Sequence, residues 1–220
     1  MSERLIWLEH VAFGYADARP VLDACSLEVH AGERIGLMGP IGSGKTTLLR
    51  LIVGLVHPTA GRVEVFGKTR TSEKDFGEVR PRVGYLFQDP DDQLFCPTVA
   101  EDVAFGPFNL GKPRAEVKRI VAETLEQLGL GGYEDRVAYQ LSGGEKRLVA
   151  LAGVLAMQPD VLLLDEPTAG LDPATADHVV EILQALPQAM VIVSHDQTHL
   201  QQIARTCWTL SEGQLQSANS

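Results

Sequence analysis

The sequence predicts an α/β fold in which a parallel or mixed β-sheet is covered by helices and carries an inserted helical subdomain. Short apolar segments typical of strands alternate with segments of helical periodicity, which favours a parallel sheet with helical connections. Between residues 98 and 157 the strand-like segments stop, and helical periodicity takes their place. A glycine-rich turn also joins an early apolar strand to a helix.

The part of the chain before the insertion contains most of the predicted strands. Apolar runs and alternating patterns predict them at Arg4–Glu9, Ser26–His30, Arg34–Met38, Arg62–Phe66 and Val83–Phe87. A helix is predicted over Lys45–Leu55. It should end before His57-Pro58, because the residue that precedes a proline disfavours helical backbone angles.

Helical periodicity dominates the middle of the chain, and strands return after it. In Arg114–Leu128 apolar residues recur every three or four positions with charged residues between them. Strands are predicted at Val161–Leu164, Met190–Val193 and Thr206–Leu210, with a helix near Ala174–Leu186. We therefore predict a single domain over residues 1–220, with a core formed by 1–97 and 158–220 and a helical subdomain at 98–157.

Composition and charge argue against several classes of protein. The 220 residues are 45% hydrophobic and 22% charged, as in a globular domain, and the formal net charge of −10 argues against a nucleic-acid partner. The longest apolar run, Leu148–Met157, is too short to span a bilayer. Cys25, Cys96 and Cys207 form no CxxC pair, and this odd number of thiols favours a reducing compartment.

The turn after the strand Arg34–Met38 matches the phosphate-binding pattern GxxxxGK[ST], called the P-loop. It reads GPIGSGKTT, and Gly42 and Gly44 would let backbone N–H groups curve around phosphate oxygens. Lys45 would reach the β- and γ-phosphates, and the Thr46 hydroxyl would bind Mg²⁺. The alternative is an ordinary turn, but the pattern follows an apolar strand and opens a helix, as phosphate binding requires.

Two carboxylates end a later apolar strand in the segment VLLLDEP. The carboxyl ends of parallel strands form the edge where ligands bind. Asp165 is therefore a candidate to hold Mg²⁺ through water, and Glu166 is a candidate to orient the attacking water and accept its proton. The alternative is an acidic turn without a catalytic role.

Three further residues are candidates because of their positions. Gln88 follows a predicted strand, where its amide could bind Mg²⁺ and sense the γ-phosphate. His195 follows the strand Met190–Val193 and could contact the γ-phosphate; the alternative pairs it with His199 as metal ligands. Tyr15 could stack on an adenine, although such a residue is more often a packing aromatic.

A second glycine-rich segment, QLSGGEKR, begins at Gln140 and also predicts an anion site. Ser142 is a good N-cap, and Gly143 and Gly144 leave backbone N–H groups at the positive end of the following helix. The alternative is an ordinary capped helix. One chain thus carries two helix starts that favour phosphate.

Together these motifs resemble the ATP-binding subunits of ABC transporters over about Leu5 to Gly213. The motifs, in chain order, are the P-loop, Gln88, LSGGEKR, LLLDEP, the segment Ala169-Gly170-Leu171-Asp172 and His195. The resemblance implies the ABC ATPase fold, which is a P-loop NTPase core with a mixed or parallel sheet, N-terminal antiparallel strands and the helical subdomain.

The resemblance also implies ligands and residue roles. ATP and Mg²⁺ are the expected cofactors, with Lys45, Gln88, Glu166 and His195 in catalysis and Thr46, Gln88 and Asp165 at the metal. The residues expected to bind nucleotide are Tyr15, Gly39, Pro40, Gly42, Ser43, Gly44, Lys45, Thr46, Thr47, Ser142, Gly143, Gly144 and Asp172.

Two such ATPase domains pack head to tail in this family, which would explain two anion sites in one chain. The glycine-rich segment at Ser142 would close the γ-phosphate of ATP bound to a partner domain, and Asp172 would lie in the crossing loop. The partner is a copy of this chain or a paralogue. Ile41 replaces an asparagine common in the P-loop and Glu145 a glutamine, and neither change removes a group expected in catalysis.

A narrower resemblance, to the ATPases of energy-coupling-factor importers of the cobalt/nickel type, is carried by Gly84–Phe95 and Thr98–Pro107. It implies a motor subunit that lies peripherally on the cytoplasmic face of the cell membrane. Its partners would be a transmembrane coupling subunit and a substrate-binding membrane subunit, with a transition-metal ion or a vitamin as cargo. The same region holds an acidic cluster that is either a solvated loop or a dock for basic residues of a membrane partner: Asp89, Asp91, Asp92, Glu101 and Asp102.

Two other functions remain as alternatives. A soluble ABC-type ATPase acting on nucleic acid or ribosomes would commonly have two fused domains or long inserts, and this chain is acidic. A lone P-loop kinase or GTPase would have no LSGGEKR segment.

Overall fold

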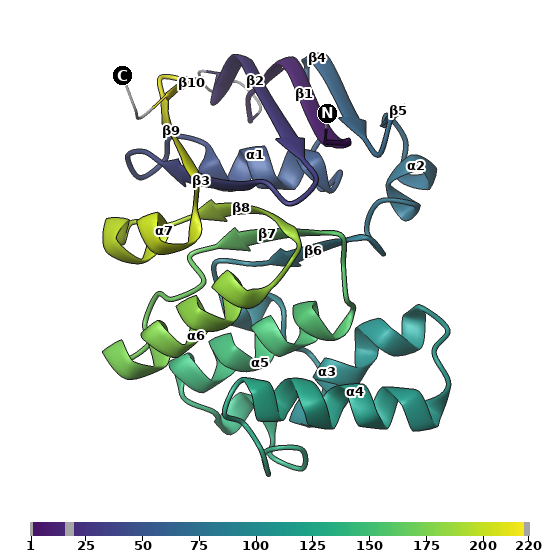
Figure 1. Cartoon of the computed structure of the whole chain (residues 1–220). Coiled ribbons are helices and arrows are strands. Elements are labelled where there is room, and N and C mark those ends of the chain that lie inside the picture. Colours follow the sequence, from purple (N-terminus) through teal and green to yellow (C-terminus); the bar gives the residue numbers. More distant parts are fainter. Residues whose placement is uncertain (1, 16–19, 218–220) are drawn as a thin grey trace.

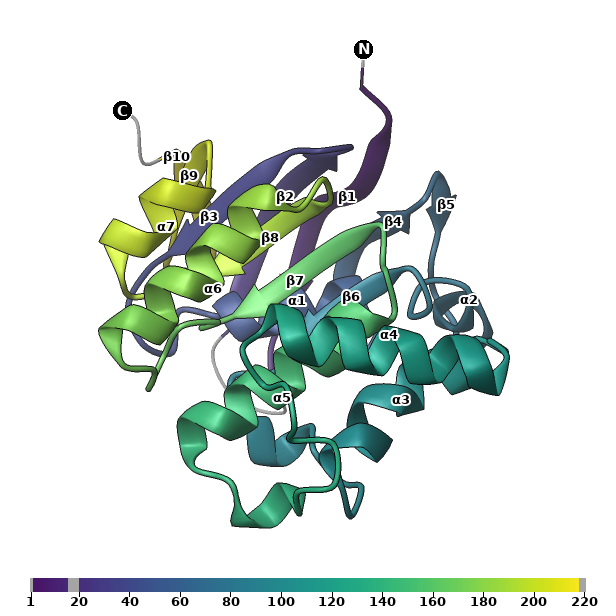
Figure 2. The ribbon, with the colours of Figure 1, turned by 60° about the horizontal axis from the view of Figure 1, so that its bottom comes forward.

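The computed structural model describes residues 2–15 and 20–217 and confirms the predicted α/β fold (Figure 1). In Figure 1 an antiparallel sheet lies at the top, and helix α1 lies between it and a larger sheet. The longer helices α3 to α6 lie on the opposite side of the larger sheet. Figure 2 shows α3, α4 and α5 gathered beside β6, in agreement with their mutual contacts.

The larger sheet has the strand order β10-β9-β3-β8-β7-β6. All neighbouring pairs in it are parallel except β9 with β10. The bounds are β3 Arg34–Met38, β6 Val83–Leu86, β7 Val161–Asp165, β8 Ala189–Val193, β9 Thr206–Ser211 and β10 Gln214–Ser217. Every residue of β7 and β8 is buried, as expected for parallel strands covered on both faces.

The other sheet is antiparallel, as the family resemblance implied, with the order β2-β1-β4-β5. The bounds are β1 Arg4–Phe13, β2 Leu22–His30, β4 Ala60–Val65 and β5 Lys68–Thr69. β1 and β2 are longer than predicted because irregular pairing interrupts their alternation. The register shifts between Leu8 and Val11, and His10 and Ala24 both have φ of 47°.

The helices predicted at Arg114–Leu128 and near Ala174–Leu186 are present, whereas the one predicted at Lys45–Leu55 ends earlier. Their bounds are α1 Lys45–Ile52, α2 Glu73–Gly77, α3 Val99–Asn109, α4 Arg114–Gln127, α5 Gly143–Ala156, α6 Pro173–Ala185 and α7 Gln197–Ile203, with 3₁₀ turns at Pro90–Asp92 and Ala138–Gln140. The short elements α2, α7, β5 and β10 were not predicted. Helix α1 ends at Ile52 rather than Leu55, and Gly54 just beyond it has φ of 69°. The division at residues 98 and 157 stays a prediction.

The larger sheet separates two hydrophobic clusters. Leu162 and Leu164 of β7 face the cluster that includes α3 to α6, whereas Val161 and Leu163 face the cluster formed with α1 and the antiparallel sheet. Because successive side chains of a strand point to opposite faces, β7 contributes residues to both hydrophobic clusters. Within residues 2–15 and 20–217, no helix combines the length and apolar character needed to cross a membrane.

Gly54→Ala should destabilise the fold more than Gly67→Ala. Both glycines have positive φ, 69° and 71°, so an added side chain strains either backbone. A Cβ at Gly54 would lie 2.2 Å from the buried ring of Phe76, whereas nothing lies within 4 Å of one at Gly67. We expect Gly67→Ala to lower the free energy of unfolding by about 1 kcal/mol and Gly54→Ala by about 1–3 kcal/mol more. Urea unfolding measures both, and equal losses would contradict the expected clash.

Candidate functional site

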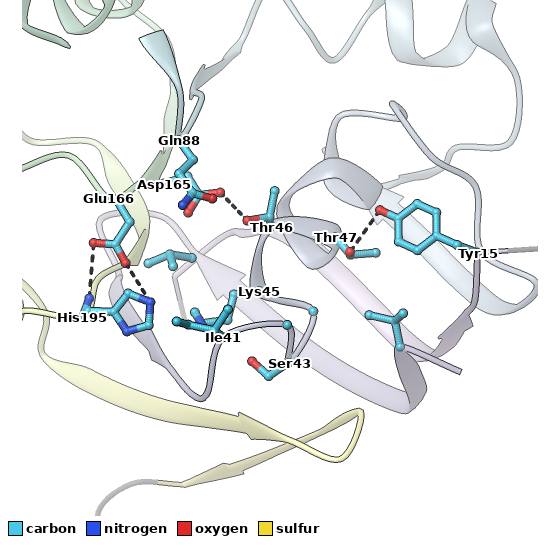
Figure 3. Close-up of a pocket in the computed structure, with 14 residues that line it drawn as sticks. Tyr15, Ile41, Ser43, Lys45, Thr46, Thr47, Gln88, Asp165, Glu166 and His195 are labelled. Carbon is cyan, nitrogen blue, oxygen red and sulfur yellow. Dashed lines mark hydrogen bonds and ion pairs between the residues drawn. The ribbon is translucent and has the colours of Figure 1, made fainter. Parts of the chain in front are cut away.

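The loops that follow β3, β6, β7 and β8 meet at one edge of the larger sheet. The P-loop follows β3, Gln88 follows β6, Glu166 follows β7 and His195 follows β8. They enclose a pocket of about 550 Å³ (Figure 3). The pocket is lined by Tyr15, Val21, Ile41, Gly42, Ser43, Gly44, Lys45, Thr46, Thr47, Gln88, Asp165, Glu166, Val193 and His195. Parallel strands thus bring together the predicted residues although they lie far apart in the sequence.

Two glycines of the P-loop occupy positions where a side chain would not fit. Gly39 has φ of 145°, and a Cβ there would lie 2.2 Å from the carbonyl oxygen of Leu210. Gly44 has φ of 102°, and a Cβ would lie 2.7 Å from Val21. Gly44 is also the N-cap of α1 and has no side chain to satisfy the first N–H groups of the helix. These N–H groups are free to bind an anion.

Lys45 is the first residue of α1, and its side chain turns back along the loop. Its Nζ donates to the carbonyl oxygens of Gly39 at 2.8 Å and Pro40 at 2.9 Å. Gly39 and Pro40 thus hold the lysine rather than line the pocket. Burial lowers the pKa of the Lys45 ammonium, and the charges of Glu166 and Asp165 raise it in part. The loop therefore holds a buried cation where phosphate is expected.

Thr46 and Asp165 form a pair of oxygen donors at the same edge. The Thr46 hydroxyl donates to Asp165 Oδ2 at 2.6 Å. Asp165 is 1% exposed, and burial raises the pKa of its carboxyl against the opposing effects of Thr46 and Lys45. Gln88 is exposed and lines the same pocket with its amide. Hydroxyl, carboxylate and amide oxygens fit Mg²⁺, which takes oxygen ligands and keeps several waters.

Glu166 is held in an unusual backbone conformation. Its φ is 55°, a left-handed value that costs a residue other than glycine about 1–3 kcal/mol. Its N–H donates to the carbonyl oxygen of Val193 at 2.9 Å, and its own carbonyl oxygen accepts from the N–H of Ala169 at 3.2 Å. Burial raises the pKa of the Glu166 carboxyl, which suits a group that must accept a proton.

His195 lies against Glu166 rather than with His199. The N–H of His195 donates to Glu166 Oε2 at 3.3 Å, and its Nε2 lies 3.5 Å from Oε1. His199 instead contacts Asp177 at 3.2 Å and Asp196 at 2.9 Å. Within the described ranges no cluster of three or more His, Cys, Asp or Glu could hold a metal ion. This geometry does not support the alternative of a histidine metal pair.

Tyr15 marks the other end of the pocket. Figure 3 shows it on the opposite side of Lys45 from Glu166 and His195. Its hydroxyl lies 3.2 Å from Thr47 Oγ1, and its ring packs edge to face on Phe13 at 4.8 Å. The residue is 45% exposed, so part of its side chain remains available. An elongated ligand with a flat group at Tyr15 and an anion at Lys45 would fit this shape.

The second predicted anion site lies outside this pocket. Ser142, Gly143, Gly144 and Asp172 are not among its described lining residues. Ser142 caps α5 in a capping box, in which its hydroxyl accepts from the N–H of Glu145. Asp172 caps α6 by accepting from the N–H of Thr175, without a capping box. Gly144 lies next to Leu171, so these two helix starts are neighbours on the surface.

Sequence analysis missed residues outside the pocket whose hydrogen bonds hold the pocket residues in position. Gln93 accepts from the N–H of Phe87 at 3.0 Å and donates to the carbonyl oxygen of Ala150 at 3.0 Å, which ties the loop after β6 to α5. Arg147 lies within QLSGGEKR, yet its buried side chain reaches Gln88 and Glu166. No sequence signal identifies these contacts, because they depend on how α5 packs against the sheet.

Comparisons with known proteins agree on one family. A family model described as ABC transporter matches residues 22–169. The energy-coupling factor transporter ATP-binding protein EcfA of Methanothermobacter thermautotrophicus is 46% identical over 215 residues, which cover 96% of this chain and 69% of the relative. The structure of cbiO1 from Clostridium perfringens, part of the ABC transporter complex cbiONQ, has a TM-score of 0.85 at 33% identity and covers 97% of this chain and 87% of that chain. A dimeric ATP-binding cassette in a post-hydrolysis state, bound to ADP and Pi, has a TM-score of 0.88 at 26% identity over 96% of this chain and 97% of that chain.

Glu166→Gln should retain ATP binding but lose steady turnover, because the amide cannot accept a proton from water. We expect hydrolysis to fall at least a thousandfold, or ~4 kcal/mol of barrier at about 1.4 kcal/mol per tenfold. Steady-state ATPase assays and nucleotide titration measure the two properties, and size-exclusion chromatography should detect an ATP-trapped dimer. Glu123→Gln, an exposed glutamate on α4, is the control. Near-normal turnover by Glu166→Gln would refute the role of Glu166.

Proposed function

This chain belongs to the ABC transporter family of ATP-binding proteins, and on that basis we propose that it is the motor subunit of an energy-coupling-factor importer. As a member of the family it is an ATPase coupled to transmembrane transport. The observation that carries the proposal is a single pocket that combines the Lys45 ammonium, the Thr46–Asp165 pair and the Glu166 carboxylate, with Tyr15 at its far end.

The proposed roles of the site residues follow from their positions. The Lys45 ammonium turns from the carbonyl oxygens of Gly39 and Pro40 toward the β- and γ-phosphates, which the N–H groups of the P-loop also bind. Glu166 accepts a proton from the water that attacks the γ-phosphorus while the bond to the bridging oxygen of ADP breaks. His195 holds the Glu166 carboxylate and reaches the γ-phosphate.

Thr46, Gln88 and Asp165 would hold Mg²⁺ beside the phosphates. When bound, this ion offsets phosphate charge and fixes the orientation of the oxygens. The pair formed by Thr46 and Asp165 already brings two oxygens within 2.6 Å of each other. Asp165 would act through water, because its carboxylate is almost fully buried behind the threonine.

A head-to-tail pair of ATPase domains accounts for the separate position of the second anion site. The start of α5 exposes Ser142 and Gly143, and the α6 cap at Asp172 is exposed beside it. In the proposed pair, Ser142, Gly143 and Gly144 contact the γ-phosphate of ATP in the partner's pocket, and Asp172 lies where the two chains cross. Its support includes a related cassette that forms a dimer bound to ADP and Pi. The partner is a second copy or a paralogue.

A groove between α3 and α5 suits a helix of a membrane partner. Phe95 and Phe105 line it and pack edge to face at 4.7 Å. Asp102 also lines it and is 8% exposed. Its Oδ1 accepts from the N–H groups of Phe95 at 3.1 Å and Cys96 at 3.0 Å, while Oδ2 is buried without a nitrogen or oxygen donor among the described residues and the Cys96 thiol interacts with the carboxylate. An apolar groove with an unsatisfied carboxylate oxygen fits a helix that carries an arginine or a lysine.

Fewer carboxylates of the acidic cluster are free to bind a membrane partner than the sequence suggested. Several of them already have partners within the chain. Asp89 caps the 3₁₀ turn Pro90–Asp92. Asp91 pairs with Lys146 at 2.6 Å, and Glu101 forms a capping box at the start of α3. The proposed dock is therefore the groove around Asp102 rather than all five carboxylates.

Similarity to EcfA and cbiO1 supports the energy-coupling type. On this proposal the chain lies at the cytoplasmic face of the cell membrane with a transmembrane coupling subunit and a substrate-binding membrane subunit. Its cargo is a transition-metal ion such as cobalt or nickel, or a vitamin. A soluble ABC-type ATPase that acts on nucleic acid or ribosomes has less support, because the net charge is −10 and the relatives carry transporter names.

Variants with Lys45→Ala and Ser142→Arg should complement each other in a mixed dimer. Alone, Lys45→Ala removes the charge that offsets the phosphates, and Ser142→Arg places a bulky cation in the partner's γ-phosphate site. In a heterodimer both defects fall in one composite site, and the other site contains the intact P-loop of one chain and the intact α5 start of the other. ATPase assays before and after mixing should show activity returning. Mixed dimers without recovered activity would count against the head-to-tail arrangement.

Phe105→Ser should reduce association with membranes, whereas Phe108→Ser should not. Both residues are on α3 and similarly exposed, 47% and 49%, but only Phe105 lines the groove among the described residues. The loss of a buried aromatic anchor typically costs about 2 kcal/mol or more of binding energy. Sedimentation of membranes from the native host, followed by quantitative immunoblotting of each variant, measures the association. Equal retention of both variants would contradict docking in the groove.

A further inference from the structure

Arg147 is a buried arginine that joins two parts of the candidate site from behind. The residue is 8% exposed, and its side chain extends from α5. One guanidinium nitrogen donates to the carbonyl oxygen of Glu166 at 2.8 Å, and the other donates to the carbonyl oxygen of Gln88 at 2.8 Å. Arg147 is not among the described residues that line the ATP pocket. Its hydrogen bonds to the site go to these two backbones, and its charge also acts through space on the carboxylates of Glu166 and Asp165.

The contact with Glu166 falls on a strained residue. The left-handed backbone of Glu166 is otherwise held by Val193 on its N–H and by Ala169 on its carbonyl oxygen. Arg147 adds a second donor to that carbonyl oxygen. A conformation of this kind persists only where its surroundings impose it, so each additional hydrogen bond narrows the directions in which the side chain can point.

The contact with Gln88 is not needed to attach its loop to α5. Lys146 already pairs with Asp91, and Gln93 already donates to the carbonyl oxygen of Ala150. Arg147 instead acts at Gln88 itself. In the part of the chain that the structure describes, Arg147 makes no close ion pair, and its hydrogen bonds go to these two carbonyl groups. The planar guanidinium, unlike an ammonium, offers donors in a fixed fork that spans both.

We propose that Arg147 is a positioning residue that sets Glu166 and Gln88 relative to each other and to helix α5. The inference rests on the proposed function, in which Glu166 accepts the proton and Gln88 binds Mg²⁺. Helix α5 begins at Ser142, which contacts the partner's nucleotide in the proposed dimer. A shift of α5 when the partner binds ATP therefore moves Glu166 and Gln88 of its own chain, and Arg147 links the two composite sites.

The test compares steady-state ATP hydrolysis by the wild-type protein, with its partner domain present, and by its Arg147→Met and Arg147→Lys variants. We expect Arg147→Met to lower kcat tenfold to about a hundredfold, the range produced by small misplacements of catalytic groups. The KM for ATP should stay within about twofold, because the P-loop contacts are unchanged. Arg147→Lys should lie between Arg147→Met and the wild type, because an ammonium does not reproduce the fork.

Arg70→Met is the matched control for a purely structural role. Arg70 is 5% exposed and donates to the carbonyl oxygens of Val65 and Asp75, each at 3.1 Å, but it does not line the pocket among the described residues. It should lower the thermal midpoint and leave the kcat of the folded protein unchanged. A decrease in kcat that is equal for Arg70→Met and Arg147→Met would overturn the positioning role.

A double-mutant cycle separates positioning of Glu166 from a general effect. In the Glu166→Gln background, Arg147→Met should lower the single-turnover rate much less than it does in the wild type, because there is no longer a carboxylate to position. Fully additive effects would overturn the inference, and so would wild-type turnover by Arg147→Lys, which decides the matter if Arg147→Met does not fold. Normal turnover by Glu166→Gln would instead refute the proposed function.

Discussion

The structure depends on the burial of both faces of its central parallel strands. β7 and β8 have no exposed residue, so neither strand can carry a polar side chain for the site along its length. Polar groups are instead placed where the strands end, and all of these ends lie at the same edge. Asp165 is the last residue of β7, and the P-loop, Gln88 and His195 follow three other strands. The pocket is thus a consequence of how the core is buried.

Electrostatics in the pocket favours a ligand that brings charges of both signs. Burial lowers the pKa of Lys45 and raises the pKa of Asp165 and of Glu166, so the charged form of each group is disfavoured despite their mutual attraction. Phosphate oxygens would stabilise the ammonium, and a divalent cation would stabilise the carboxylates. Neither ligand alone would stabilise both the buried ammonium and the buried carboxylates. This agrees with the joint binding of ATP and Mg²⁺ expected for an ABC ATPase.

The sequence was sufficient to predict the site residues that follow directly after apolar strands. The P-loop, the acidic end of β7, Gln88 and His195 could be located because each follows an apolar strand, and the structure brings them into one pocket. The extent of β1 and β2 could not be predicted, because bulges break the alternation that identifies strands. The internal partners of Arg147 were equally hidden, since they arise from the packing of α5 against the sheet. Long-range contacts of this kind leave no periodic pattern.

The larger sheet divides the hydrophobic interior into two clusters, and this division affects which substitutions related proteins can accumulate independently. Substitutions at distant positions without shared neighbours have nearly additive effects on stability. Side chains beneath α3 to α5 belong to one cluster, and those beneath α1 and the antiparallel sheet belong to the other. If a membrane protein docks in the α3–α5 groove as proposed, lineages can remodel the surface around it while the half that carries the P-loop keeps its packing. The same ATP-hydrolysing domain could in this way serve transporters with unrelated cargoes.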